Sequence, residues 1–231
     1  DGGVRLARGL LHFFRSRVLW NGQWSERLRV ANHSLDAVDV PISVRFDADF
    51  ADVFEVRGTR RPRRGQRLPA AAYPETVMKY RGLDGRERAT RITTAPAPGR
   101  TRDGLLGFGL HVEPHAFAEI EITIACEIDG PGRPAPYDEI LSRLKRGSAE
   151  RALRDCVVFS ANEAFNRWMR RSSADLRMMI TDTPHGPYPY ACIPWYSTPF
   201  GRDGIVTALE LLWASPDIAR GVLDFLAATQ A

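Results

Sequence analysis

The sequence predicts a two-domain fold, an antiparallel β-sandwich followed by a series of helices, and three observations lead to this prediction. Residues 1–129 alternate apolar and polar side chains with a period of two, which is the spacing of half-buried strands. Residues 130–136 read Gly-Pro-Gly-Arg-Pro-Ala-Pro, a composition that favours an extended, semi-rigid linker. From residue 137 to residue 231 the apolar side chains recur at helical spacing instead. We therefore expect a domain boundary at this linker.

The β-part contains two long alternating runs, Val38–Phe46 and Ile120–Ile128, in which every second residue is apolar or, at Cys126, small and expected to point inward. Turn dipeptides such as Asn21-Gly22 and Asp84-Gly85 separate the shorter runs. Those shorter runs lie at residues 12–20, 27–32, 76–80, 88–93 and 105–111. Because each predicted strand has one apolar face, the strands must cover each other, and a two-sheet sandwich does this.

Residues 47–58 interrupt the alternation. Asp47, Asp49 and Asp52 are spaced like calcium ligands, but the glycine and terminal glutamate of an EF-hand loop are missing, so capping and turn roles are favoured. Six arginines follow between Arg57 and Arg67. They fit either a patch for an anionic ligand or a solvated, mobile loop, and the lack of interleaved aromatic residues favours the loop over a nucleic-acid site.

Composition excludes several classes of function. The chain has 32 Lys and Arg residues, of which only Lys79 and Lys145 are lysine, a bias that does not indicate phosphate contacts. No apolar run approaches the roughly 20 residues of a membrane span, and the first residues lack the apolar core of a signal peptide. Three cysteines without a Cys-x-x-Cys pair indicate reduced thiols in a cytoplasmic protein. Pro114 argues against a helical metal site at His111 and His115. We expect no cofactor, metal, nucleic-acid or membrane partner.

The C-terminal part contains the patterns of four helices. The first begins near Tyr137, and a capping box of Ser160 and Glu163 is expected to begin a second, which ends before Pro184. A third helix follows residue 204, and Ser215-Pro216-Asp217 is typical of the start of a fourth. These helices carry more apolar side chains than they can cover among themselves. We therefore expect the natural chain to continue beyond residue 231.

The stretch from Ile193 to Gly204 is the candidate binding site. It combines aromatic residues, two prolines and two glycines with the adjacent pair Arg202 and Asp203, just before a helical pattern. A guanidinium beside a carboxylate suits a neutral ligand with vicinal hydroxyl groups, and an aromatic ring such as Trp195 suits the apolar face of a sugar. The alternative is structural, with Asp203 capping the next helix and Arg202 as its ion-pair partner. From the residues alone, both interpretations stay open.

Three motifs in the same order resemble the bacterial glycogen debranching enzyme (amylo-α-1,6-glucosidase) family. They are Ala48–Gly58, then Asn162 with Phe165-Asn166 and Asp175-Leu176-Arg177, and finally Ala191–Gly204 with the Ser215–Leu223 run. The resemblance implies that the helices from residue 137 onward are the first of an (α/α)6 toroid of about a dozen helices. It also implies that Arg202 and Asp203 hold the non-reducing glucose, with Trp195 as a wall of the site. Cys192 departs from the family pattern, which favours a small residue there.

The resemblance implies an inverting glycoside hydrolase that acts on an α-glucan or oligosaccharide, with one carboxylic acid and one carboxylate as the catalytic pair. Glu163, Asp175 and Glu210 fall within predicted helices, so the catalytic residues are unknown and are expected beyond residue 231, which would leave this chain inactive. Two alternatives remain: a non-catalytic carbohydrate-binding protein, and a toroidal glycosidase for another oligosaccharide. Binding of an anionic polymer by Arg57–Arg67 is the least favoured interpretation. The oligomeric state is not predicted.

Overall fold

The computed structural model describes residues 7–71, 76–102, 104–130, 132, 134–152, 156, 158–192 and 195–230. The chain divides into two compact units. Unit 1 comprises Asp1–Ala51 and Arg60–Leu144, and unit 2 comprises Asp52–Thr59 and Lys145–Ala231. Each unit has its own core, and each is described separately below.

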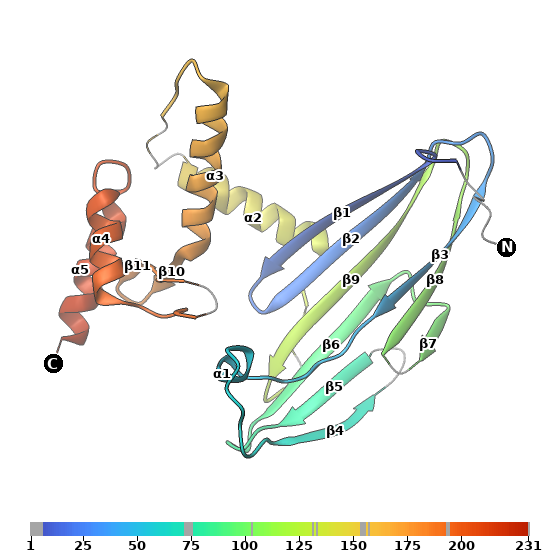
Figure 1. The fold of residues 1–231 in the computed structure, drawn as a ribbon, viewed down its shortest axis with the longest axis horizontal. Helices are drawn as coiled ribbons and strands as arrows, with labels where there is room; N and C mark the ends of the chain where they lie inside the picture. Colours follow the sequence, from blue (N-terminus) through green and yellow to red (C-terminus); the bar gives the residue numbers. More distant parts are fainter. Residues whose placement is uncertain are drawn as a thin grey trace. The chain divides into compact units, whose positions relative to one another are not determined.

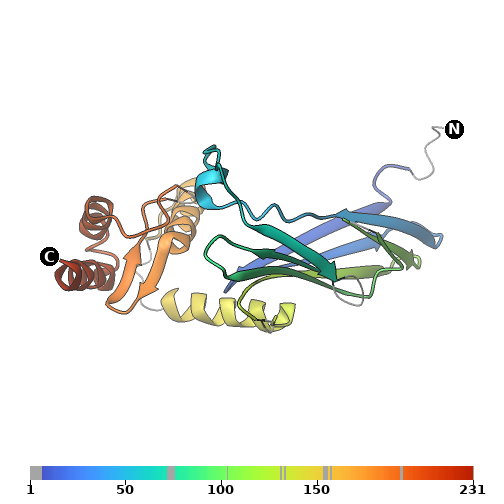
Figure 2. The same ribbon diagram turned by 90° about the horizontal axis from the view of Figure 1, so that it is seen from below.

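Unit 1 is the predicted antiparallel β-sandwich, which is confirmed (Figures 1 and 2). The larger sheet has six strands in the order β1 (Leu11–Trp20), β2 (Gln23–Asn32), β9 (Phe117–Ile128), β6 (Glu87–Ala95), β5 (Thr76–Arg81) and β4 (Gln66–Ala71). The smaller sheet has three strands in the order β3 (Val38–Arg45), β8 (Leu105–Val112) and β7 (Arg100–Arg102). All neighbouring strands in both sheets pair antiparallel.

The core of unit 1 lies between the two sheets. Val30, Ile92 and Ile120 from the larger sheet meet Leu106 and Phe108 from the smaller sheet, and all five are buried. Alternation along each strand therefore predicted the inward faces correctly for most of their length. The prediction fails at the end of β9, where Cys126 is exposed and Ile128 keeps 55% of its surface exposed. β9 has 12 residues and β8 has 8, so the smaller sheet cannot cover the whole inner face of the longer strand.

The outward face of the larger sheet carries cross-strand ion pairs. Arg27 pairs with Glu121, and Arg91 pairs with Glu127 at 2.7 Å between Nε and Oε1. Helix α2 (Tyr137–Ala152) begins against this face, where Tyr137 and Ile140 pack on Val18. The polar residues of the alternating pattern are thus satisfied by each other or covered by the first turns of α2.

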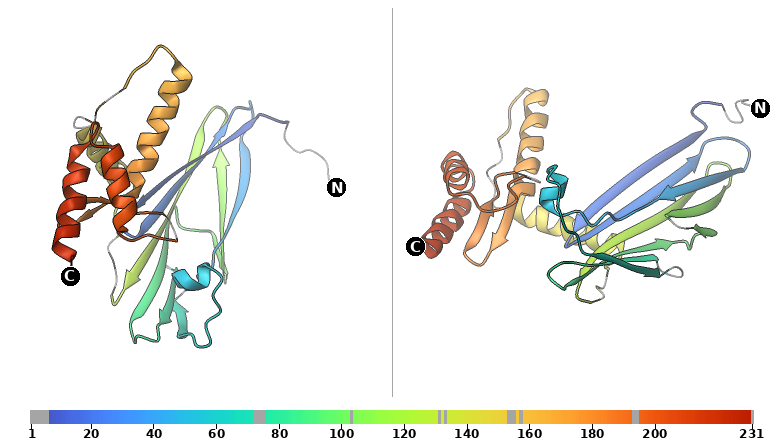
Figure 3. Two further views of the ribbon diagram at one scale, coloured as in Figure 1. Left: turned by 60° about the vertical axis from the view of Figure 1, so that its left-hand side comes forward. Right: turned by 60° about the horizontal axis from the view of Figure 1, so that its bottom comes forward.

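Unit 2 contains helices α1 (Val53–Val56), α3 (Glu163–Met179), α4 (Gly201–Glu210) and α5 (Pro216–Thr229). α4 and α5 run side by side in opposite directions, joined by a short turn (Figure 3). Sequence reasoning missed the hairpin of β10 (Ile180–Thr183) and β11 (Gly186–Pro189), and β10 occupies the place given to the end of the second predicted helix. The core of unit 2 packs Tyr188 of β11 against Ile218 and Val222 of α5.

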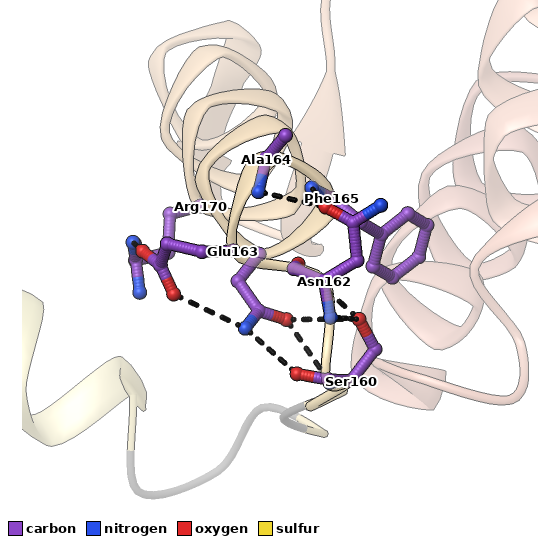
Figure 4. Close-up of polar contacts among 7 residues, drawn as sticks. Ser160, Asn162, Glu163, Ala164, Phe165 and Arg170 are labelled. Carbon is purple, nitrogen blue, oxygen red and sulfur yellow. Dashed lines mark hydrogen bonds and ion pairs between the residues drawn. The ribbon is translucent and has the colours of Figure 1, made fainter.

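The start of α3 differs from the prediction. Asn162, not Ser160, is the cap, because its side chain accepts hydrogen bonds from the backbone amides of Ala164 and Phe165 (Figure 4). The buried Asn166 side chain forms two hydrogen bonds with the backbone of Ser160. Its Oδ1 accepts from the Ser160 amide at 3.0 Å, and its Nδ2 donates to the Ser160 carbonyl oxygen at 2.9 Å. The predicted capping box of Ser160 and Glu163 is therefore wrong, since the backbone before α3 folds back onto Asn166.

The capping and turn roles predicted for the aspartates before α1 are confirmed. Asp52 caps α1 and forms a capping box with Glu55, while Asp47 and Asp49 each accept a hydrogen bond from a nearby backbone amide. Within the described ranges, no group of three or more His, Cys, Asp or Glu side chains could hold a metal ion. In the same ranges no helix has the length and apolar character needed to cross a membrane.

The contact between β11 and α5 generates a prediction for Gly221. A Cβ atom added to Gly221 would lie 2.2 Å from the carbonyl oxygen of Pro187, so the helix and the strand touch backbone to backbone. Gly221→Ala should therefore lower the free energy of unfolding by about 1–3 kcal/mol, the usual cost of overpacking, as measured by urea denaturation.

Gly147→Ala is the matched control, because nothing lies within 4 Å of a Cβ there. The control should be neutral or slightly stabilising, since alanine favours helices. Equal effects of the two substitutions would contradict the close packing.

Candidate functional site

The three predicted site residues lie on the segment between β11 and α4. Trp195 lies in the connecting loop and is 45% exposed. Arg202 and Asp203 are the second and third residues of α4, which begins at Gly201. Asp203 therefore sits in the first helical turn, where the positive end of the helix dipole favours a carboxylate.

The Arg202 and Asp203 side chains converge without forming a hydrogen bond. Arg202 Nε lies 3.9 Å from Asp203 Oδ2, the outer limit of an ion pair, and the Arg202 side chain is 83% exposed. Among the residues that the structure describes, neither side chain has a hydrogen-bond partner, and the start of α4 has no side-chain cap. The structural interpretation of Asp203 as a cap is therefore not supported. The guanidinium donors and carboxylate acceptors remain available to a ligand.

Tyr188 holds the start of α4 in place. Its side chain is fully buried, and its hydroxyl donates to the carbonyl oxygen of Phe200 at 2.9 Å. The same carbonyl accepts the backbone amide of Gly204 at 2.8 Å, the first hydrogen bond of the helix. A Cβ at position 204 would lie 2.4 Å from the tyrosine hydroxyl, which accounts for the glycine next to Asp203. Burial and, secondarily, the negative charge of Asp203 raise the pKa of Tyr188.

The loop before α4 presents aromatic rings. Two backbone hydrogen bonds connect Cys192 and Tyr196 on either side of Trp195. The Cys192 amide donates to the Tyr196 carbonyl at 3.3 Å, and the Tyr196 amide donates to the Cys192 carbonyl at 3.1 Å. The ring of Tyr196 meets Phe200 edge to face, with 5.3 Å between centroids. The guanidinium carbon of Arg57 lies 5.2 Å from the centroid of Trp195 and 5.5 Å from that of Tyr196. This contact joins two of the motifs that the sequence analysis treated separately.

Sequence reasoning missed Arg57 as a neighbour of the site. It placed Arg57 in an arginine-rich loop between Arg57 and Arg67, and no local pattern points to a partner so distant in the sequence. Other members of that cluster also have partners: Arg64 donates to the carbonyl oxygen of Asp49 at 2.8 Å, and Arg67 pairs with Asp47 at 3.4 Å. The cluster is thus partly built into local structure.

A cavity of about 810 Å³ lies elsewhere in unit 2, between α3, the β10–β11 hairpin and α5. Its lining includes Asp182, His185 and Asp224, and it includes none of Trp195, Arg202 and Asp203. The candidate site is therefore an exposed turn flanked by aromatic rings, distinct from this cavity.

The family comparison places the chain among the carbohydrate-active proteins. The family model described as the N-terminal domain of (some) glycogen debranching enzymes matches residues 1–123, and the chain belongs to this family. No curated protein matches the chain.

Two solved structures show a partial similarity to this chain. A protein described as a kojibiose phosphorylase from the human microbiome is 14% identical, with a TM-score of 0.40, over 74% of this chain and 22% of that chain. A polysaccharide lyase is 13% identical, with a TM-score of 0.31, over 54% of this chain and 21% of that chain. The present chain therefore spans about a fifth of the length of either protein.

The support that Tyr188 gives to the site leads to a second prediction. Tyr188→Phe removes the hydrogen bond to the Phe200 carbonyl while leaving the ring in the core, and it should lower the free energy of unfolding by about 1 kcal/mol. Urea denaturation measures this loss. Tyr190→Phe is the control, because the Tyr190 hydroxyl has no hydrogen bond within the described part of the chain. Equal stability of the two variants would show that the hydroxyl does not hold the turn.

Proposed function

We propose that this chain is the N-terminal part of an inverting α-glucan glucosidase that removes α-1,6 branches from glycogen, and that its Arg202–Asp203 turn binds a terminal glucose. The observation that carries the proposal is the pair itself: two adjacent side chains converge on the first turn of α4, and their hydrogen-bonding groups are not used by the described residues. Membership of the debranching enzyme family supports a glucan as the ligand.

The chemistry of the turn suits a sugar ring. Arg202 offers planar N–H donors to ring or hydroxyl oxygens, and Asp203 accepts hydrogen bonds from two neighbouring hydroxyl groups. The exposed ring of Trp195 offers an apolar face to the C–H groups of the same sugar. The hydrogen bond from the buried Tyr188 to the Phe200 carbonyl holds the turn, so the site would be preorganised before a ligand binds.

The carboxylic acids Glu163 and Asp175 of α3 do not suit the catalytic roles. An inverting enzyme needs a carboxylic acid with a raised pKa and a carboxylate across the sugar from it. The hydrogen bond from Arg170 lowers the pKa of Glu163, helped by Asn166, and Asp175 is paired with Arg171 at 2.9 Å. We propose that the catalytic pair comes from residues outside these 231, so this part supplies substrate contacts.

The helices also support an (α/α) toroid. Ile205, Leu209 and Leu212 on and after α4 keep 50%, 70% and 52% of their surfaces exposed, and Trp213 keeps 64%. Apolar surface on this scale is favourable to cover. We propose that further helices of the toroid pack on this face.

Sugar binding is tested with the purified 231-residue chain and maltotetraose in calorimetric titration. Arg202→Ala and Asp203→Asn should each weaken the affinity about 10- to 100-fold, because each removes a hydrogen bond to a charged group. Arg220→Ala is the matched control, since Arg220 is an exposed arginine that pairs with Asp217 on α5. Unchanged affinity in both site variants, or no affinity in the wild-type chain, would refute the assigned site.

The proposed absence of the catalytic pair has its own test. The chain incubated with a branched α-glucan should release no glucose above the background of a heat-treated sample, as measured by a coupled glucose assay. Glucose release that Arg202→Ala abolishes would place the catalytic acids within these 231 residues.

A further inference from the structure

The short helix α1 places one charged side chain beside the candidate site. Arg57 follows directly after α1, and its guanidinium carbon lies 5.2 Å and 5.5 Å from the ring centroids of Trp195 and Tyr196 and 6.0 Å from that of Phe54. In unit 2, α1 lies next to the segment that joins β11 to α4 (Figures 1 and 2). Arg57 thus faces three aromatic rings.

The backbone around Arg57 is held at both ends of α1. The capping box of Asp52 and Glu55 fixes the first turn. At the other end, the Gly58 amide donates to the Glu55 carbonyl at 2.9 Å and the Thr59 amide donates to the Phe54 carbonyl at 2.9 Å. Gly58 adopts a φ of +93°, which favours glycine and closes the turn directly after Arg57. The direction in which Arg57 leaves the backbone is therefore set locally.

Within the described part of the chain, the Arg57 guanidinium interacts with aromatic rings instead of with a carboxylate. Among the described residues, Arg57 has no carboxylate partner, whereas Arg67 of the same cluster pairs with Asp47. A guanidinium within about 6 Å of an aromatic centroid is attracted by the electron-rich face of the ring. The Arg57 cation lies within this distance of both Trp195 and Tyr196.

We infer that Arg57 is a positioning residue that orders the Trp195–Tyr196 loop for sugar binding, an inference that rests on the proposed function of this loop. Trp195 and Tyr196 keep 45% and 47% of their surfaces exposed with Arg57 in place, so ring surface remains for a ligand. Without Arg57, the Cys192–Tyr196 backbone bonds and the contact of Tyr196 with Phe200 would remain, but the Trp195 ring would have to become ordered on binding. Restraint by Arg57 removes that entropic cost before the sugar arrives.

The test compares Arg57→Gln and Arg57→Lys in the 231-residue chain, with Arg60→Gln as the matched control. Arg60 is an exposed arginine three positions further on that has no ring contact within the described part of the chain. One measurement is the affinity for maltotetraose. The other is acrylamide quenching of Trp195 fluorescence without ligand, obtained by subtracting the signal of the same variant carrying Trp195→Phe.

Arg57→Gln should weaken maltotetraose binding about 3- to 10-fold and increase the quenching of Trp195. Arg57→Lys should recover part of both effects, because it keeps a cation near the rings. Arg60→Gln should change neither. The inference is overturned if Arg57→Gln matches Arg60→Gln in either measurement, or if Arg57→Lys recovers nothing. Should Arg57→Gln fail to fold, the Arg57→Lys variant alone decides, since weaker binding with raised quenching is expected there too.

The two proposals fail in different ways. If Arg202→Ala abolishes binding while Arg57→Gln leaves it unchanged, the role of Arg57 is refuted and the sugar site stands. If the wild-type chain does not bind maltotetraose, the proposed function fails, and the role of Arg57 in sugar binding fails with it.

Discussion

The candidate site depends on the packing of one buried ring, that of Tyr188. The ring lies against Phe225 of α5, with 4.9 Å between centroids, and its hydroxyl reaches the Phe200 carbonyl at the start of α4. It can do so because Gly204 has no Cβ, and the neighbouring residue Pro187 can touch α5 because Gly221 has none. The hairpin thus touches α5 backbone to backbone and reaches α4 through the Tyr188 side chain. The packing of this core therefore sets the position of the turn that carries Arg202 and Asp203.

The same turn breaks a local preference. Acidic residues are favoured in the first turn of a helix and basic residues are not, yet Arg202 directly precedes Asp203 there. Neighbouring residues on a helix diverge by roughly 100°, and here the two groups still approach to 3.9 Å. At this distance and exposure the pair adds little to stability. A departure from a local rule is expected at a functional site, which agrees with the ligand-binding role proposed for this turn.

Sequence reasoning succeeded where the signal is local and periodic. Alternation identified the sandwich, and the Ser215-Pro216-Asp217 signal gave the start of α5, which begins at Pro216. It failed at the hairpin, because β10 falls at the predicted end of a helix that stops before Pro184, and β11, which contains Pro187 and Pro189, resembles a loop. Exposure of Cys126 depends on the length of the opposing sheet, which no single strand reveals.

The candidate site shows the same division. The adjacency of Arg202 and Asp203 was visible in the sequence, as was the nearby Trp195. The contribution of Arg57 was not, because it arises when residues far apart in the chain meet. The contact between Arg57 and the rings gives a role to the residues around α1. Asp52 and Glu55 cap the start of the helix, Gly58 closes the turn after it, and Arg57 points toward the rings. A helix of only 4 residues contributes little packing of its own, with no buried residue in it. Its elaborate capping is better explained by the side chain that it presents than by the stability that it adds.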